Sequence, residues 1–175
     1  YNPIIKSIRE LEKPVVCAVN GIAAGAGANL AFACDIVLAA REASFIQAFC
    51  KIGLIPDSSG TFFLPRLAGF ARASGMTLLG DRISAEQACQ WGLIWQVIDG
   101  AELTQKAREL ARHLATQPTR GLGLTKRALN AALDNDLNSQ LDVEEALQRE
   151  AGRTRDFAEG VRAFLAKRAP TFEGC

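Results

Sequence analysis

The chain has 175 residues, of which 49% are hydrophobic, enough for one core. Its net charge of +1 gives no general attraction to nucleic acid or to an anionic membrane, and no apolar run reaches the roughly 18 residues of a membrane span. One histidine, His113, and five cysteines without CxxC spacing argue against a metal site and fit a reducing cytoplasm. We therefore expect no metal, no nucleic acid partner and no membrane partner.

Residues 1–100 mix helix and strand patterns. Asn2-Pro3 begins a helix that Lys13-Pro14 ends. "GIAAGAG" (21–27) is too rich in glycine for a helix interior and predicts a turn, which leads into the apolar helix "ANLAFAC" (28–34). "SAEQACQWG" (84–92) has a capping box and predicts a short helix. Four apolar runs predict buried strands: "VVCAVN" (15–20), "DIVLAA" (35–40), "ASFIQ" (43–47) and "LIWQVI" (93–98). Such an order predicts an α/β core.

Residues 101–175 show helical patterns alone. Thr154 is a candidate N-cap for the last helix. This region is either a helical cover for the sheet or an oligomerisation surface. Its apolar stripes are Leu103, Ala107, Leu110, Ala111 and Leu114; then Leu137, Leu141, Leu147 and Ala151; and finally Phe157, Val161, Phe164 and Leu165.

The glycine turn "NGIAAGAGANL" (20–30) joins a strand to a helix start, where free backbone N–H groups favour negative charge. A dinucleotide fingerprint needs GxGxxG, but Gly25 and Gly27 have no third glycine after them, and a P-loop lysine is missing. Two readings stay open from this stretch alone. The glycines either allow close packing or form an oxyanion hole for a developing enolate.

"GLIPDSSGTFFLP" (53–65) places one carboxylate, Asp57, among apolar and small residues. Asp57 is either the N-cap of the helix that "DSSGTFF" begins or an acid–base group. Shelter by Ile55 and Pro56 would make the carboxylate a stronger base. His113 lies on an amphipathic helix beside Arg112, which favours a solvated side chain and argues against a Ser-His-Asp hydrolase.

Taken together, four segments resemble the crotonase (enoyl-CoA hydratase/isomerase) superfamily. They follow the family's order and cover nearly the whole chain. The resemblance implies a spiral β-β-α core, its N-terminal part missing here, and a helical region that builds homotrimers or hexamers made of two trimers. The segments are "KPVVCAVNGIAAGAGANLAFACDIVLAA", "ASFIQAFCKIGLIPDSSGTFFLPRLAG", "ISAEQACQWGLIWQVI" and "EGVRAFLAKRAPTF".

The resemblance also implies roles for single residues. Asp57 falls where family isomerases keep a catalytic aspartate, and an oxyanion-hole N–H falls on Ala26. Hydratases of the family place two glutamates around the added water, where this chain has Asn29 and Phe49, so water addition should be poor. Two glycines flank Ala26 and, with Asn29 and Phe49, would line the substrate pocket: Gly25 and Gly27.

Phe164 and Lys167 match family positions that contact coenzyme A, although a core Phe and a solvated Lys remain alternatives. The resemblance implies an isomerase of acyl-CoA thioesters that needs no separate cofactor, because coenzyme A is part of the substrate. It would open a phenylacetyl-CoA ring epoxide to oxepin-CoA or convert 3-enoyl-CoA to 2-enoyl-CoA. Alternatives are a hydratase, a dehalogenase-type enzyme with Asp57 as nucleophile, an RNA-binding branch and a non-catalytic paralogue.

Overall fold

A computed structural model describes residues 1–175, which form two compact units. The first unit contains residues 1–9 and 15–110, and the second contains residues 10–14 and 111–175. All strands lie in the first unit. No helix is both long and apolar enough to cross a membrane.

One sheet of the first unit is parallel, with strand order β1-β3-β6. Val16 of β1 lies opposite Ile36 of β3, and Leu38 of β3 lies opposite Gln96 of β6. These strands arise from the predicted apolar runs, but only β3 is largely buried, as a strand with apolar residues on both faces can be. The prediction of a buried strand is wrong for β1, which has no buried residue, and holds only for Ile98 at the end of β6. Their bounds are β1 Val16–Val19, β3 Ile36–Ala40 and β6 Gln96–Ile98.

A second sheet has the order β2-β4-β5, in which β2 (Ile22–Ala24) is parallel and β5 (Arg82–Ser84) antiparallel to β4 (Ser44–Ile46). The prediction that residues 21–27 are wholly a turn is therefore wrong. Ile22–Ala24 pair with β4, and the turn follows at Gly25. Strand β5 has only three residues and carries no predicted strand pattern.

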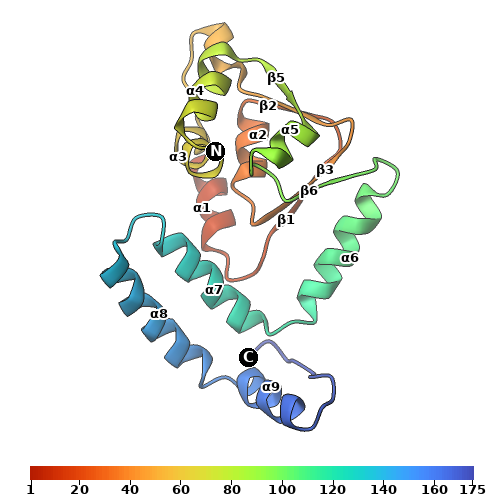
Figure 1. Cartoon of the computed structure of the whole chain (residues 1–175), viewed down its shortest axis with the longest axis vertical. Helices are drawn as coiled ribbons and strands as arrows, with labels where there is room; N and C mark the ends of the chain where they lie inside the picture. Colours follow the sequence, from red (N-terminus) through yellow and green to blue (C-terminus); the bar gives the residue numbers. More distant parts are fainter. The chain divides into compact units, whose positions relative to one another are not determined.

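Helices and strands alternate in a way that repeats (Figure 1). The order strand–strand–helix occurs as β1-β2-α2 and again as β3-β4 followed by helical turns, which is the predicted β-β-α arrangement. Ser84 caps α5 by accepting a bond from the Gln87 N–H. The helices of this unit are α1 Asn2–Glu10, α2 Ala26–Phe32, the 3₁₀ turn η1 Ala48–Ile52, α3 Gly60–Ala68, α4 Phe70–Leu79, α5 Ala85–Gln90 and the start of α6 Leu103–Ala115.

The core of the first unit lies around β4 and its neighbours. Phe45 and Leu64 are fully buried, and the rings of Phe32 and Phe45 stack with their centroids 5.2 Å apart. At the edge of β3, Asp35 pairs with Arg9 at 2.9 Å and accepts a bond from the Val15 N–H. This packing fixes α2 against β2 and β4, which matters because α2 carries the candidate oxyanion site.

The second unit is helical, with α7 (Thr119–Ala131), α8 (Leu137–Ala151) and α9 (Arg155–Leu165). Arg120 pairs with both Glu12 and Glu150. The prediction that Thr154 caps the last helix is confirmed, because its hydroxyl accepts a bond from the Phe157 N–H.

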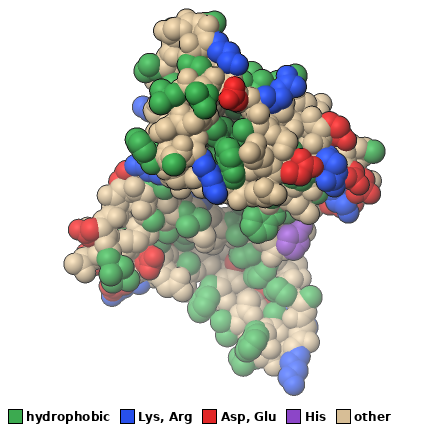
Figure 2. All heavy atoms as spheres, turned by 45° about the horizontal axis from the view of Figure 1, so that its top comes forward, with side chains coloured by type: hydrophobic (Ala, Val, Ile, Leu, Met, Phe, Trp, Pro, Cys, Tyr) green, Lys and Arg blue, Asp and Glu red, His purple; other side chains and the backbone are tan.

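The predicted apolar stripes of α8 and α9 are exposed in this chain. Leu137, Leu141, Phe157 and Phe164 all lie on the surface, and hydrophobic side chains are visible on it (Figure 2). Leu141 and Leu147 line a groove of about 480 Å³ between α7 and α8. Within the second unit, therefore, these stripes are not a buried core.

Candidate active site

The glycine turn places a backbone N–H group that has no partner within the helix at the start of α2. Gly25 is the N-cap of α2 with φ of 53°, a conformation that favours glycine, and its N–H donates to the Ile46 carbonyl at 2.8 Å. Ala26 is the first helical residue, so its N–H has no carbonyl of the helix to bind. The ring of Phe49 packs on Gly25, where an added Cβ would lie 3.3 Å from Cζ. The turn can therefore present the Ala26 N–H, while Gly27 beside it is exposed.

Asp57 lies in a tight turn just before α3. Ser58 and Ser59 have φ of 49° and 68°, two consecutive left-handed residues that are not glycine. The Asp57 carbonyl accepts bonds from the Gly60 N–H at 2.9 Å and from Asn29 Nδ2 at 2.8 Å. The Ser58 hydroxyl donates to Asp57 Oδ1 at 2.9 Å. The Asp57 turn is thus tied directly to α2, which begins at the candidate oxyanion group.

The prediction that apolar neighbours shelter Asp57 is wrong for this chain. Asp57 is exposed, and Leu54 and Ile55 are exposed too, at 59% and 79%. The reason is that the chain reverses at Gly53, with φ of 74°, and the loop after it turns its apolar side chains outward. The helix-cap alternative does not hold either, because the N-cap of α3 is Ser59 and makes no side-chain cap.

Asn29 and Gln47 form a buried amide pair that the sequence analysis did not assign as a pair. Asn29 is 1% exposed and Gln47 is 0% exposed, and Gln47 Nε2 donates to Asn29 Oδ1 at 2.8 Å. Gln47 Oε1 has no partner. The signal in the sequence is a single amide inside the apolar run "ASFIQAFC". Asn29 and Phe49, both buried, have no ionisable group to act on water.

A family model described as "Enoyl-CoA hydratase/isomerase" matches residues 1–175. The chain belongs to the enoyl-CoA hydratase/isomerase family. The predicted resemblance is confirmed, and with it the fold class: a mixed α/β core followed by a helical region.

Several named proteins resemble this chain over almost all of its residues. It is 61% identical over 174 residues to a 1,2-epoxyphenylacetyl-CoA isomerase from Escherichia coli (strain K12), covering 99% of this chain and 66% of that protein. It is 36% identical to a carnitinyl-CoA dehydratase from Salmonella typhi, covering 97% and 67%. A crystal structure of an enoyl-CoA hydratase from Polaromonas sp. JS666 matches with a TM-score of 0.92 at 37% identity, covering 97% and 66%. The chain therefore spans about two thirds of these relatives.

The residues that the resemblance to the enoyl-CoA hydratase/isomerase family assigns to coenzyme A lie in the second unit. Phe164 is 83% exposed on α9, and Lys167, also exposed, follows that helix with φ of 52°. The prediction that Phe164 and Lys167 contact coenzyme A stays a prediction. The alternative of a core Phe is wrong, because the Phe164 ring is not buried.

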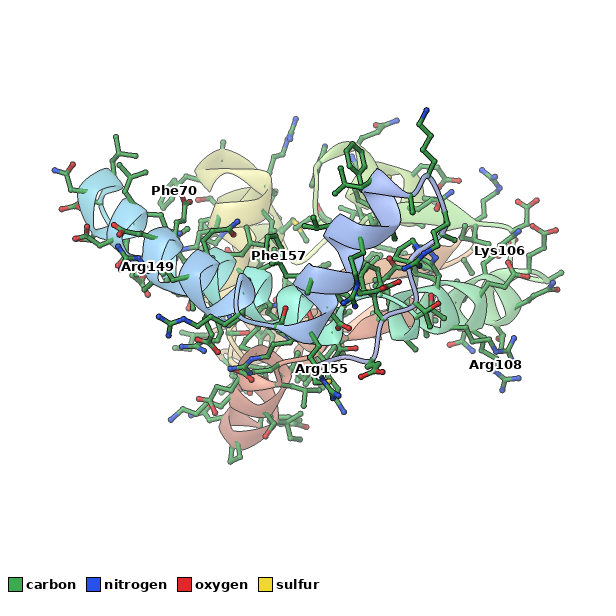
Figure 3. All side chains as sticks on the ribbon, turned by 90° about the horizontal axis from the view of Figure 1, so that it is seen from below. Phe70, Lys106, Arg108, Arg149, Arg155 and Phe157 are labelled. Carbon is green, nitrogen blue, oxygen red and sulfur yellow. The ribbon has the colours of Figure 1, made fainter.

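After Lys167 the chain folds back over α9 and is held by two acids of that helix. Asp156 follows Arg155 at the start of α9, where Figure 3 labels Arg155 and Phe157. It is buried and accepts bonds from the N–H groups of Glu173 at 2.7 Å and of Gly174 at 2.8 Å. These bonds fasten the end of the described chain to the first turn of α9.

Glu159 is the second of these acids. It accepts two bonds from Arg168, at 2.6 and 3.0 Å, and one from the Thr171 N–H at 3.1 Å. Arg168, chiefly, with the Thr171 N–H, lowers the pKa of Glu159 to about 2. Arg168 and the Thr171 N–H stabilise the ionised form of Glu159 over the protonated form. Their bonds to Glu159 are therefore strongest while Glu159 is ionised.

Glu159→Gln should lower the melting temperature at pH 7 because it removes the charge that Arg168 binds. The pKa of Glu159 is depressed, so its stabilisation is present above the ordinary value of 4.5 and is lost as the pH falls toward 2. We expect the difference in melting temperature between the wild type and Glu159→Gln to narrow below pH 4.5. Glu145→Gln, which removes the exposed pair with Arg149 on α8, is the control and should change little. A constant difference from pH 7 to pH 3 would contradict the assignment.

The cysteines are free thiols, of which four are half-buried and Cys175 is exposed. Cys34 Sγ donates to the Leu30 carbonyl at 3.3 Å, and the interaction between the thiols of Cys17 and Cys34 lowers the pKa of Cys17 and raises that of Cys34. His113 is exposed in the last turn of α6, as predicted for a solvated helical histidine. No group of three or more His, Cys, Asp or Glu side chains could hold a metal ion.

Proposed function

We propose that this chain is part of an isomerase of acyl-CoA thioesters in which Asp57 moves the proton. The observation that carries the proposal is the 2.8 Å bond from Asn29 Nδ2 to the Asp57 carbonyl. It holds the only carboxylate of residues 53–65 next to α2, whose first residue is Ala26. An acid and a free N–H group on neighbouring turns are the two parts that enolate chemistry requires.

In the proposed reaction the Asp57 carboxylate takes a proton from the carbon next to the thioester carbonyl. The electron pair of that C–H bond moves toward the carbonyl, whose oxygen becomes an enolate oxygen. The Ala26 N–H would bind this oxygen, and one such donor typically stabilises the transition state by about 2.7–4 kcal/mol. Asp57, now neutral, returns the proton at another carbon of the conjugated system, so one residue both takes and gives the proton.

Because Asp57 is exposed in this chain, the proposed proton transfer requires that the substrate shield its carboxylate from water. A solvated carboxylate is a weak base, so the bound acyl group has to cover Asp57 and displace water from it. Ile55 and Leu54, exposed beside Asp57, offer apolar surface to such a group. Asn29 and Phe49 support isomerisation over hydration, because neither can activate a water molecule.

For the substrate we propose ring-1,2-epoxyphenylacetyl-CoA, with 3-enoyl-CoA as a second substrate. The support is the 61% identity to the isomerase named for that epoxide. The test is to assay the full-length protein with both thioesters and compare kcat/KM. We expect the higher value for the ring epoxide. A higher value for 3-enoyl-CoA would reverse the ranking, and no conversion of either would reject the isomerase function.

A further inference from the structure

Two buried amides connect the core of the first unit to the turn that carries Asp57. Gln47 Nε2 donates to Asn29 Oδ1, and Asn29 Nδ2 in turn donates to the Asp57 carbonyl. Each of these two bonds is 2.8 Å long, and Asn29 is the middle residue. Residues 18 and 28 positions apart in the sequence are joined in this way. We call these two side chains, Gln47 and Asn29, the amide relay.

The direction of the amide relay follows from its last acceptor. A backbone carbonyl can only accept, so Asn29 must present its NH₂ group to Asp57 and its oxygen to Gln47. Gln47 must then present its own NH₂ group to Asn29. The Asp57 carbonyl thus fixes the orientation of the Asn29 amide, and Gln47 holds the other end of that amide by donating to its oxygen.

Gln47 lowers the free energy of unfolding relative to an apolar side chain at the same position. Its Oε1 atom is buried without a partner, although an apolar side chain of similar size would leave no such atom. Asp57 needs this support, since the two residues after it, Ser58 and Ser59, are held in the left-handed region. Backbone in that region persists only where the surroundings over-determine it.

We propose that Gln47 and Asn29 are positioning residues, which hold the Asp57 carbonyl and thereby aim the Asp57 carboxylate at the substrate. The inference rests on the proposed function, because it concerns how the same aspartate is oriented. Both amides are buried and bonded within the protein, so we assign them no contact with the reacting atoms. Gln47 acts on Asn29, Asn29 acts on the Asp57 backbone, and the effect should appear in kcat with KM unchanged.

Gln47→Met tests the relay, because it keeps the length of the side chain and removes the NH₂ donor. We expect kcat to fall about 10- to 100-fold, as misplacing a catalytic group does, while KM stays within about twofold. Ser44→Ala is the matched control: its hydroxyl is also buried without a partner, at the start of β4, but lies outside the relay. It should leave kcat unchanged. A Gln47→Met protein with the wild-type kcat would overturn the proposal.

Gln47→Glu provides a measurement, the pH dependence of kcat, that should not change if Gln47 had only a structural role. The protonated carboxyl group introduced by this change can donate to Asn29, whereas the ionised group cannot, and burial favours the protonated form at neutral pH. The ratio of kcat between Gln47→Glu and the wild type should fall as the pH rises from about 6 to 9. The ionisable groups near Gln47 are Cys50, Lys51 and Asp57, and because both proteins carry all three, the ratio isolates the group introduced at position 47. A ratio independent of pH would reject the relay, even where Gln47→Met fails to fold.

Failure of the relay and failure of the proposed function give different results. Loss of turnover in Asp57→Asn with full turnover in Gln47→Met rejects the relay alone. Full turnover in Asp57→Asn rejects the proposed function itself, and with it any catalytic need to position Asp57.

Discussion

Asp57→Asn should lower the kcat of the full-length protein by about 100- to 10,000-fold, the range typical for removing a general acid–base group. Asn keeps nearly the same size, and its side-chain oxygen can still accept the bond from the Ser58 hydroxyl. The two bonds to the Asp57 carbonyl are backbone interactions and do not depend on the side chain. The loss should therefore appear in turnover with the melting temperature unchanged.

Asp99→Asn is the matched control for this change. Asp99 is an exposed aspartate of the same unit, pairs with Arg41 at 3.1 Å and takes no part in the candidate site. It undergoes the same loss of charge and should keep the wild-type kcat. Turnover of Asp57→Asn close to that of Asp99→Asn would remove Asp57 from the mechanism.

Gly60→Ala should damage both stability and turnover. A Cβ at position 60 would lie 2.4 Å from Asn29 Nδ2 and 2.8 Å from its Cγ. Asn29 is buried and bonded at both ends of its amide, so it cannot move aside without breaking the relay. Overpacking of this kind typically destabilises by about 1–3 kcal/mol. Chemical unfolding and kcat measured on the same preparation should both report the loss.

Gly75→Ala separates this clash from the general effect of replacing a helical glycine. Gly75 lies inside α4, and a Cβ there would meet nothing within 4 Å. Since Gly is less favourable than Ala in a helix by about 0.5–1 kcal/mol, Gly75→Ala should be neutral or stabilising. If Gly60→Ala proved equally harmless, Asn29 would have room to move, and the rigid packing around it would be disproved.

Much of the fold is encoded in local patterns that can be read without coordinates. The strands β1 and β3 are continuous apolar runs, and the caps at Ser84 and Thr154 depend on residues only three positions away. The local pattern of β2 predicts a turn, because the strand that pairs with it, β4, lies some twenty residues further on (Ile22 opposite Ser44). A segment of three residues is too short to carry a sequence pattern that would reveal its pairing with a distant strand.

In the candidate site, too, features that depend on neighbouring residues in the sequence could be predicted, and features that depend on tertiary packing could not. Ala26 and Asp57 could be selected from the sequence because a glycine turn and a lone carboxylate are local features. The contact between Asn29 and Gln47 could not, since both look like ordinary polar residues until tertiary packing brings their amides together. The exposure of Asp57 could not be predicted either, because residues that are apolar neighbours in sequence need not cover a side chain in space.

The double ion pair of Arg120 bears on how the protein forms. Arg120 and Glu12 are separated by 108 positions, and Lys126 reaches the Lys13 carbonyl across 113. Contacts of such long range form slowly, because a large loop has to close first. During synthesis the segment of residues 10–14 leaves the ribosome long before the helices it binds, so the second unit can complete its packing only after α7 and α8 have emerged.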